Sequence, residues 1–113
     1  MKSKILALSK NKEFKELLNK NKLTNNYVSI FFGILKNKND KKLNISFVTK
    51  KKIGNAVKRN KIKRRLRNIM NEAVKKISIK FNYSYLIIAK STMLNIEYAK
   101  IKKTIFNSFE KIK

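Results

Sequence analysis

Residues 55–77 of the chain read NAVKRNKIKRRLRNIMNEAVKKI, and they carry the clearest structural pattern in the sequence. At 3.6 residues per turn its apolar side chains fall within one stripe, and basic side chains occupy most of the remaining surface. The stripe consists of Ile62, Leu66, Ile69, Met70, Ala73 and Ile77. The spacing therefore predicts a long amphipathic helix with one buried face and one strongly basic face.

The segments on either side of this helix have the composition of strands. Residues 43–49 alternate apolar and polar side chains, and residues 82–89, NYSYLIIA, are aromatic and β-branched. The second run is apolar enough to lie in the centre of a sheet. A helix between two strands indicates a mixed α/β arrangement.

The N-terminal part of the chain predicts a helix followed by a strand. Residues 11–20 have helical spacing of apolar side chains, and Asn11 can cap that helix. Residues 19–26 are polar and are expected to be a connection, and residues 27–35 have the pattern of a strand. Residues 36–42 are rich in asparagine and lysine, which favours a hairpin turn into the next strand.

A last helix, with Asn95 as its cap, is predicted at the C-terminal end from the spacing of Tyr98, Ile101, Ile105, Phe109 and Ile112. The element order is therefore α-β-β-(β)-α-β-α. We expect an α+β fold, a two-layer α/β sandwich in which helices cover one face of a small mixed sheet of about four strands. Because the chain has 113 residues and no linker rich in glycine, serine or proline, residues 1–113 are expected to form a single domain.

The charge balance predicts a polyanionic partner. Thirty Lys and Arg residues against six Asp and Glu residues give a formal net charge of +24. A hydrophobic content of 42% argues for a folded domain rather than a disordered basic tail. There is no apolar run long enough to span a membrane, and the absence of cysteine fits a reducing compartment. We expect a cytoplasmic protein that binds nucleic acid and not a membrane.

The basic side chains concentrate between residues 50 and 67, where no acidic residue occurs and all four arginines lie near the end. The planar guanidinium group matches phosphate geometry in a way that the lysine ammonium does not. On the predicted helix the side opposite the apolar stripe carries Asn60, Arg64, Arg67 and Asn71, with Lys63 beside them. This pattern indicates one face that packs and one face that binds phosphate.

The residues just before the helix fit the same interpretation. Gly54 and Asn55 can turn the backbone tightly and present N–H groups at the positive end of the helix dipole. A face that is merely solvated would mix glutamate with lysine, but no glutamate occurs in this segment before Glu72.

Residues suited to catalysis are missing. The chain has no histidine or cysteine, and its six acidic residues are scattered along the sequence. Phosphodiester hydrolysis commonly needs a histidine or metal ions held by several carboxylates. We therefore predict neither a catalytic residue nor a metal ligand in this chain.

Residues 51–67, KKIGNAVKRNKIKRRLR, resemble the signature of the protein subunit of bacterial ribonuclease P, the RNA-containing endonuclease that matures the 5′ end of tRNA. The signature is matched at Arg59, Asn60, Lys63, Arg64 and Arg67. The resemblance implies the fold called ribosomal protein S5 domain 2-like. It also implies that the RNA subunit binds Mg²⁺ and cleaves precursor tRNA, while the protein assists.

The resemblance also implies which residues contact RNA. The resemblance, taken together with the argument for the turn before the helix, predicts contacts to the ribonuclease P RNA subunit. These contacts are expected at Lys51, Lys52, Gly54, Asn55, Arg59, Asn60, Lys63, Arg64 and Arg67. A cleft between the first helix and the sheet is expected to hold the single-stranded 5′ leader of precursor tRNA, with Phe14, Leu18 and Phe32 as its apolar residues. No obligate protein partner is evident from the sequence.

Two other classes of protein share part of this pattern. A small basic ribosomal protein that binds RNA as a structural component would have the same size and charge, and only the pattern from Arg59 to Arg67 speaks against it. A DNA-binding regulator would need a helix rich in base-reading side chains and usually a dimer surface, and neither is apparent.

Overall fold

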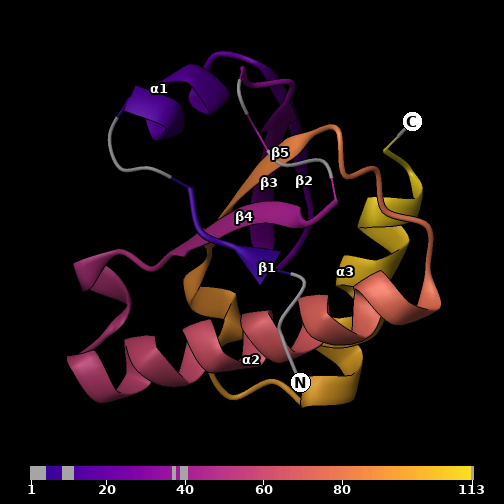
Figure 1. Ribbon diagram of the computed structural model, residues 1–113. Coiled ribbons are helices and arrows are strands. Elements are labelled where there is room, and N and C mark those ends of the chain that lie inside the picture. The colour runs from indigo at the N-terminus through magenta and orange to yellow at the C-terminus, as the bar shows by residue number, and fades with distance from the viewer. Residues whose placement is uncertain (1–4, 9–11, 37, 39–40, 113) are drawn as a thin grey trace.

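The computed structural model describes residues 5–8, 12–36, 38 and 41–112, and these form one five-stranded sheet with three α-helices (Figure 1). The strands are β1 (Ile5–Leu6), β2 (Asn21–Thr24), β3 (Val28–Gly33), β4 (Leu43–Val48) and β5 (Ser84–Ala89). The helices are α1 (Lys12–Leu18), α2 (Ala56–Lys76) and α3 (Tyr98–Glu110), with short 3-10 helices η1 (Lys51–Ile53) and η2 (Ser91–Met93). The predicted mixed α/β fold with one small mixed sheet is confirmed, and the sheet has five strands where about four were expected.

Strand β5 is central, as its apolar sequence predicts. The strand order is β1-β4-β5-β3-β2, and β5 pairs in parallel with β4 and antiparallel with β3. Helix α2 provides the long crossover that two parallel neighbours require. Because β5 lies between β3 and β4, residues 36–42 do not form the predicted hairpin turn between paired strands. Of these residues, 37, 39 and 40 lie outside the described part of the chain.

The helices cover both faces of the sheet, which corrects the expectation that they share one face. Figure 1 shows α1 above the sheet and α2 below it. The larger core cluster joins α2 and α3 to Ile30, Ile45 and Ile87, whereas a smaller cluster joins Leu17 of α1 to Leu86. Successive strand residues point to opposite faces, so β5, in which every residue except Ile88 is buried, supplies side chains to both clusters. If the sheet face that carries Leu86 were polar, α1 would have no apolar surface to pack against.

Two strands lie where the sequence predicts none. Strand β1 has two residues, and β2 falls in the polar segment that was expected to be a connection. Both are edge strands, and three of the four β2 residues are exposed, so neither needs an apolar sequence. The Lys22 ammonium on β2 lies 5.5 Å from the centroid of the Phe31 ring on β3, in a cation–π contact.

Two asparagines expected to cap helices have different outcomes. Asn95 does not cap α3, because the residue in that position is Glu97, and Asn95 instead has a positive φ of 66°. Asparagine tolerates this left-handed conformation better than most residues, so it serves the turn before the helix. Asn11 lies outside the described residues.

The side chain of Asn25 ties the β2–β3 turn to α3. Its Oδ1 accepts hydrogen bonds from the backbone N–H groups of Tyr27 (2.8 Å) and Val28 (3.0 Å), and its Nδ2 donates to Ser108 Oγ (2.9 Å). The ammonium of Lys90 donates to the Asn25 carbonyl oxygen at 2.7 Å. Tyr27, Val28 and Ser108 are buried, so water cannot readily replace these partners.

Replacement of Asn25 by alanine should therefore lower the free energy of unfolding by about 2–4 kcal/mol, since buried N–H groups lose their acceptor. Urea denaturation measures this change. The exposed neighbour Asn26 is the matched control, and Asn26→Ala should change stability by less than about 0.5 kcal/mol. Equal losses in the two variants would show that the Asn25 side chain has no special role.

Candidate nucleic-acid interface

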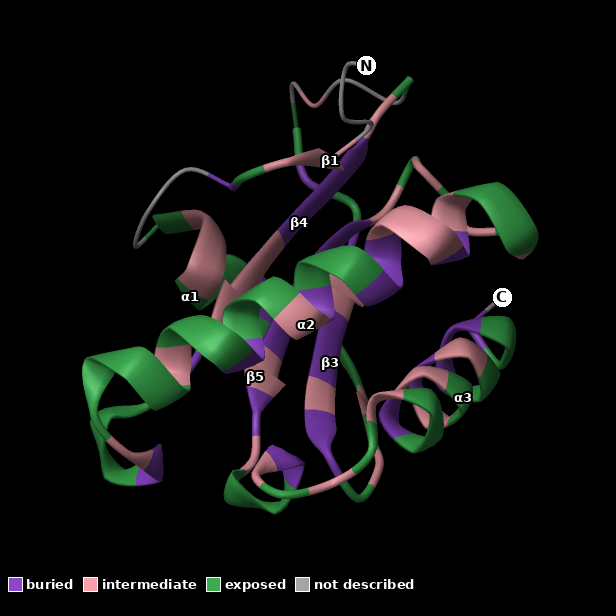
Figure 2. Cartoon of the chain, turned by 90° about the horizontal axis from the view of Figure 1, so that it is seen from below, coloured by how far each residue is buried: buried purple, intermediate pink, exposed green. Residues whose placement is uncertain are grey.

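Four side chains of the predicted RNA-binding set share the outward face of α2. Asn60, Lys63, Arg64 and Arg67 are exposed, whereas Ile62, Leu66, Ile69, Met70 and Ala73 on the opposite side are buried. Together with Val57, which is 74% exposed, the four polar residues line a shallow depression along the helix. The helix thus presents three cations and the Asn60 amide in one row, on the side of α2 that Figure 2 shows as exposed.

The other two arginines of the segment do not belong to this row. Arg65 is half-buried, and its Nη1 donates to the carbonyl oxygen of Ile96 at 3.2 Å, which fastens α2 to the segment before α3. Arg59 is also half-buried, and its Nε has no hydrogen-bond partner among the described residues. The four arginines therefore lie close together in the sequence but do not share one surface.

The turn before α2 is held by three neighbouring residues. Ile53 is buried and anchors η1, which leaves Lys51 and Lys52 exposed. Gly54 has φ 159° and ψ −167°, a conformation that is essentially restricted to glycine. The Oδ1 of Asn55 accepts a hydrogen bond from the Lys58 N–H at 3.0 Å and caps the helix. The Asn55 side chain is thus engaged in capping.

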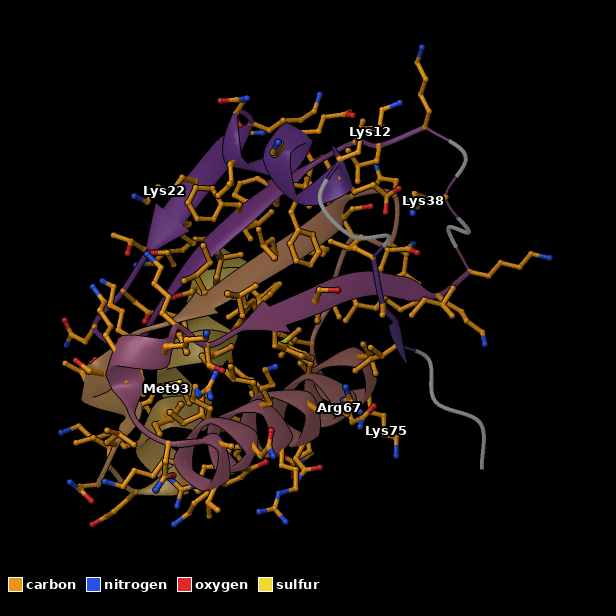
Figure 3. All side chains as sticks on the ribbon, turned by 90° about the vertical axis from the view of Figure 1, so that its left-hand side faces the viewer. Lys12, Lys22, Lys38, Arg67, Lys75 and Met93 are labelled. Carbon is orange, nitrogen blue, oxygen red and sulfur yellow. The ribbon has the colours of Figure 1, made fainter. Side chains whose placement is uncertain are left out.

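A groove of about 750 Å³ runs between α1, β4 and α2 and brings two predicted regions together. Phe14 of α1 lies on one wall, and Lys63, Arg67 and Asn71 of α2 lie on the other. Figure 3 shows Arg67 on α2. The outward face of α2 and the expected leader cleft are therefore connected surfaces.

The open edge of β4 forms the floor of this groove. Strand β1 pairs with β4 only at Leu43 and Asn44, and the Leu8 N–H then donates to Ser46 Oγ at 2.9 Å. Beyond that point Phe47 and Val48 line the groove. The helical spacing already placed Asn71 on the phosphate-binding side of α2, but sequence reasoning missed Phe47 and Val48, because it did not include β1 and could not show where β1 leaves β4.

The groove does not contain Leu18 or Phe32. Leu18 is 45% exposed at the end of α1, and Leu17 beside it is the residue that is buried. Phe32 lies on the sheet face opposite α1, with its ring centroid 5.6 Å from that of Tyr83. Phe31 faces α1 and is buried in the smaller core cluster. Assignment of Phe32 to the cleft is therefore wrong, because adjacent strand residues point to opposite faces and the spacing did not reveal which face α1 covers.

The acidic side chains are few, and two of them form ion pairs with lysines. The Glu13 Oε2 atom lies 2.5 Å from Lys38 Nζ, and the Glu72 Oε2 atom lies 3.4 Å from Lys102 Nζ. Among the residues that the structure describes, no group of three or more acidic side chains is placed to hold a metal ion. Burial and the nearby Glu72 carboxylate raise the pKa of Tyr98 above its usual value, so this phenol stays neutral.

No helix in the described ranges is both long enough and apolar enough to cross a membrane.

Comparison with known proteins relates the whole chain to one family. The sequence model of the family described as Ribonuclease P matches residues 3–113. The ribonuclease P protein component of Mycoplasma mycoides is 32% identical over 107 residues, which cover 95% of each chain. That of Carboxydothermus hydrogenoformans is 35% identical over 103 residues, which cover 88% of this chain and 84% of the relative.

Solved structures share the fold. The ribonuclease P protein from Thermotoga maritima superposes with a TM-score of 0.81 at 20% identity, over 96% of this chain and 98% of that one. The protein from Staphylococcus aureus gives a TM-score of 0.79 at 23% identity, over 95% and 94%. None of these comparisons favours a ribosomal protein. With the basic face of α2 and a family match from residue 3 to residue 113, the chain belongs to the bacterial ribonuclease P protein family.

Proposed function

We propose that this protein binds the RNA subunit of ribonuclease P through the outward face of α2, and that the RNA subunit performs the cleavage. The observation that supports this most directly is the row of Lys63, Arg64 and Arg67, all exposed on a helix whose opposite side is buried. Such a row can neutralise successive phosphates without any rearrangement of the protein. Lys51 and Lys52 on η1 extend the positive surface beyond the start of the helix.

The groove beside α2 is proposed to hold the single-stranded 5′ leader of precursor tRNA. Phe14 offers a ring on which an unpaired base can stack, and Lys63 and Arg67 on the opposite wall can bind the phosphates on either side of that base. The groove volume of about 750 Å³ lies within the range of about 300–1,000 Å³ that is usual for ligand pockets. Because Lys63 and Arg67 also belong to the outward face of α2, the leader and the RNA subunit would meet there.

The chain itself is a poor ligand for Mg²⁺. It has no histidine and only six acidic residues, and the described acidic side chains do not cluster. We therefore propose that Mg²⁺ is held by the RNA subunit. The contribution of this protein is then electrostatic, because its cations reduce the repulsion between phosphates of the RNA subunit and of the substrate. We further propose that it acts in the cytoplasm.

This division of roles predicts the outcome of reconstitution. The isolated protein with Mg²⁺ should leave precursor tRNA intact, because it supplies no general base and no metal site. Adding a bacterial ribonuclease P RNA should give cleavage at the 5′ end of the mature tRNA sequence, measured on a 5′-labelled precursor. Cleavage by RNA-free protein, abolished by EDTA, would contradict the proposal.

The leader assignment predicts a selective effect of Phe14→Ala. Loss of one stacked base should weaken binding of precursor tRNA to the holoenzyme by about 5- to 150-fold, the equivalent of about 1–3 kcal/mol. Binding of mature tRNA, which lacks the leader, should stay within about twofold of the unmodified protein. The matched control is Phe32→Ala on the opposite face of the sheet, which should not change the ratio of the two affinities. If Phe14→Ala weakens the binding of precursor and mature tRNA equally, the leader does not bind in this groove.

A further inference from the structure

A second group of cations lies on the other flank of α2. Lys58, Lys61 and Arg65 are three and seven positions apart, which places them on one side of the helix. They line a small cavity of about 160 Å³ that is separate from the groove and from the outward depression. Its other lining residues are Ile62, Met93, Leu94 and Asn95. Figure 3 places Met93 near the N-terminal end of α2, with Arg67 and Lys75 further along the helix.

One of the three cations, Arg65, is held by a hydrogen bond, and the stem of a second, Lys58, lies next to the turn before α2. The bond from Arg65 Nη1 to the Ile96 carbonyl oxygen uses one of the five guanidinium N–H donors, so the others remain for a ligand. The stem of Lys58 lies against Gly54, where a Cβ atom would come within 2.9 Å of Lys58 Cδ. Met93 is fully buried and closes the floor of the cavity. Arg65 and the floor of the cavity are therefore in place before a ligand binds.

The charges around this space are all of one sign. None of the described residues that line the cavity is acidic. Glu97, the acidic residue nearest to Asn95 in sequence, stands exposed at the N-cap of α3 and does not line the cavity. Like charges at neighbouring positions of a helix destabilise it, and an anion between them would reverse that effect.

We propose that this cavity binds a phosphate group of an RNA backbone, held by Lys58, Lys61 and Arg65. The volume of about 160 Å³ lies below the range of about 300–1,000 Å³ typical of pockets that enclose larger ligands, so a single phosphate is a better fit than a nucleoside. The proposal rests on the proposed function in one respect, namely that α2 binds RNA. It adds that RNA backbone passes along both flanks of α2, separated by the helix diameter of about 10–12 Å.

The test compares two double variants of the same helix that remove the same charge. Lys58→Gln/Lys61→Gln changes exposed residues at the cavity, and Lys75→Gln/Lys76→Gln changes exposed residues at the far end of α2. The association constant for ribonuclease P RNA is measured from 50 to 200 mM NaCl, after melting temperatures confirm that both variants fold. The slope of log K against log salt should fall by about 0.7–0.9 in the cavity variant and stay unchanged in the control.

The outcomes separate this proposal from the proposed function. Equal slopes for the two double variants would overturn the cavity site. Inorganic phosphate serves as a second probe: if it shifts the backbone amide resonances of Met93–Asn95 while the RNA slope is unchanged, the cavity takes a free anion and the RNA proposal is wrong. If the unmodified protein does not prefer ribonuclease P RNA over another structured RNA of equal length, the proposed function fails. The slopes measured on that other RNA then still decide for or against the cavity site.

Discussion

The burial of one side of α2 against the sheet is the interaction on which the functional surfaces depend. Ile62, Leu66 and Ile69 are at most 2% exposed, and the burial of each such side chain contributes about 1.5–3 kcal/mol. This apolar contact holds the helix in place although its cations repel one another. The positions of Lys63 and Arg67 are thus set by the core of the protein, so the proposed RNA-binding surface has its spacing before any RNA binds.

The basic segment divides its cations between the proposed RNA-binding surface and the packing of the fold. Arg64 and Arg67 are exposed on the outward face, whereas Arg65 bonds to the carbonyl oxygen of Ile96 and joins α2 to the segment before α3. A substitution at Arg65 would therefore disturb the fold and the charge together. This difference cannot be read from residue type, because both roles use the same guanidinium donors.

The sequence was most informative where a pattern was long and apolar. The stripe of α2 and the apolar run of β5 predicted a buried helix face and a central strand, and both predictions are confirmed. Strands β1 and β2 could not be predicted, because a two-residue strand has no period and a polar edge strand has the composition of a loop. The prediction that Phe32 lines the leader cleft was wrong for a related reason. The alternation along β3 separates Phe31 from Phe32, but only the position of α1 shows which face forms the cleft.

The polar edge strand β2 also bears on how this protein behaves before it meets RNA. An unpaired sheet edge is a template on which a second copy can add its own strand, and such growth leads to aggregation. In β2 the exposed positions include Lys22, so two copies that met edge to edge would bring lysine ammonium groups together. The cation–π contact with Phe31 keeps one of these charges at the edge. Repulsion between these ammonium groups therefore opposes edge-to-edge self-association of the free protein.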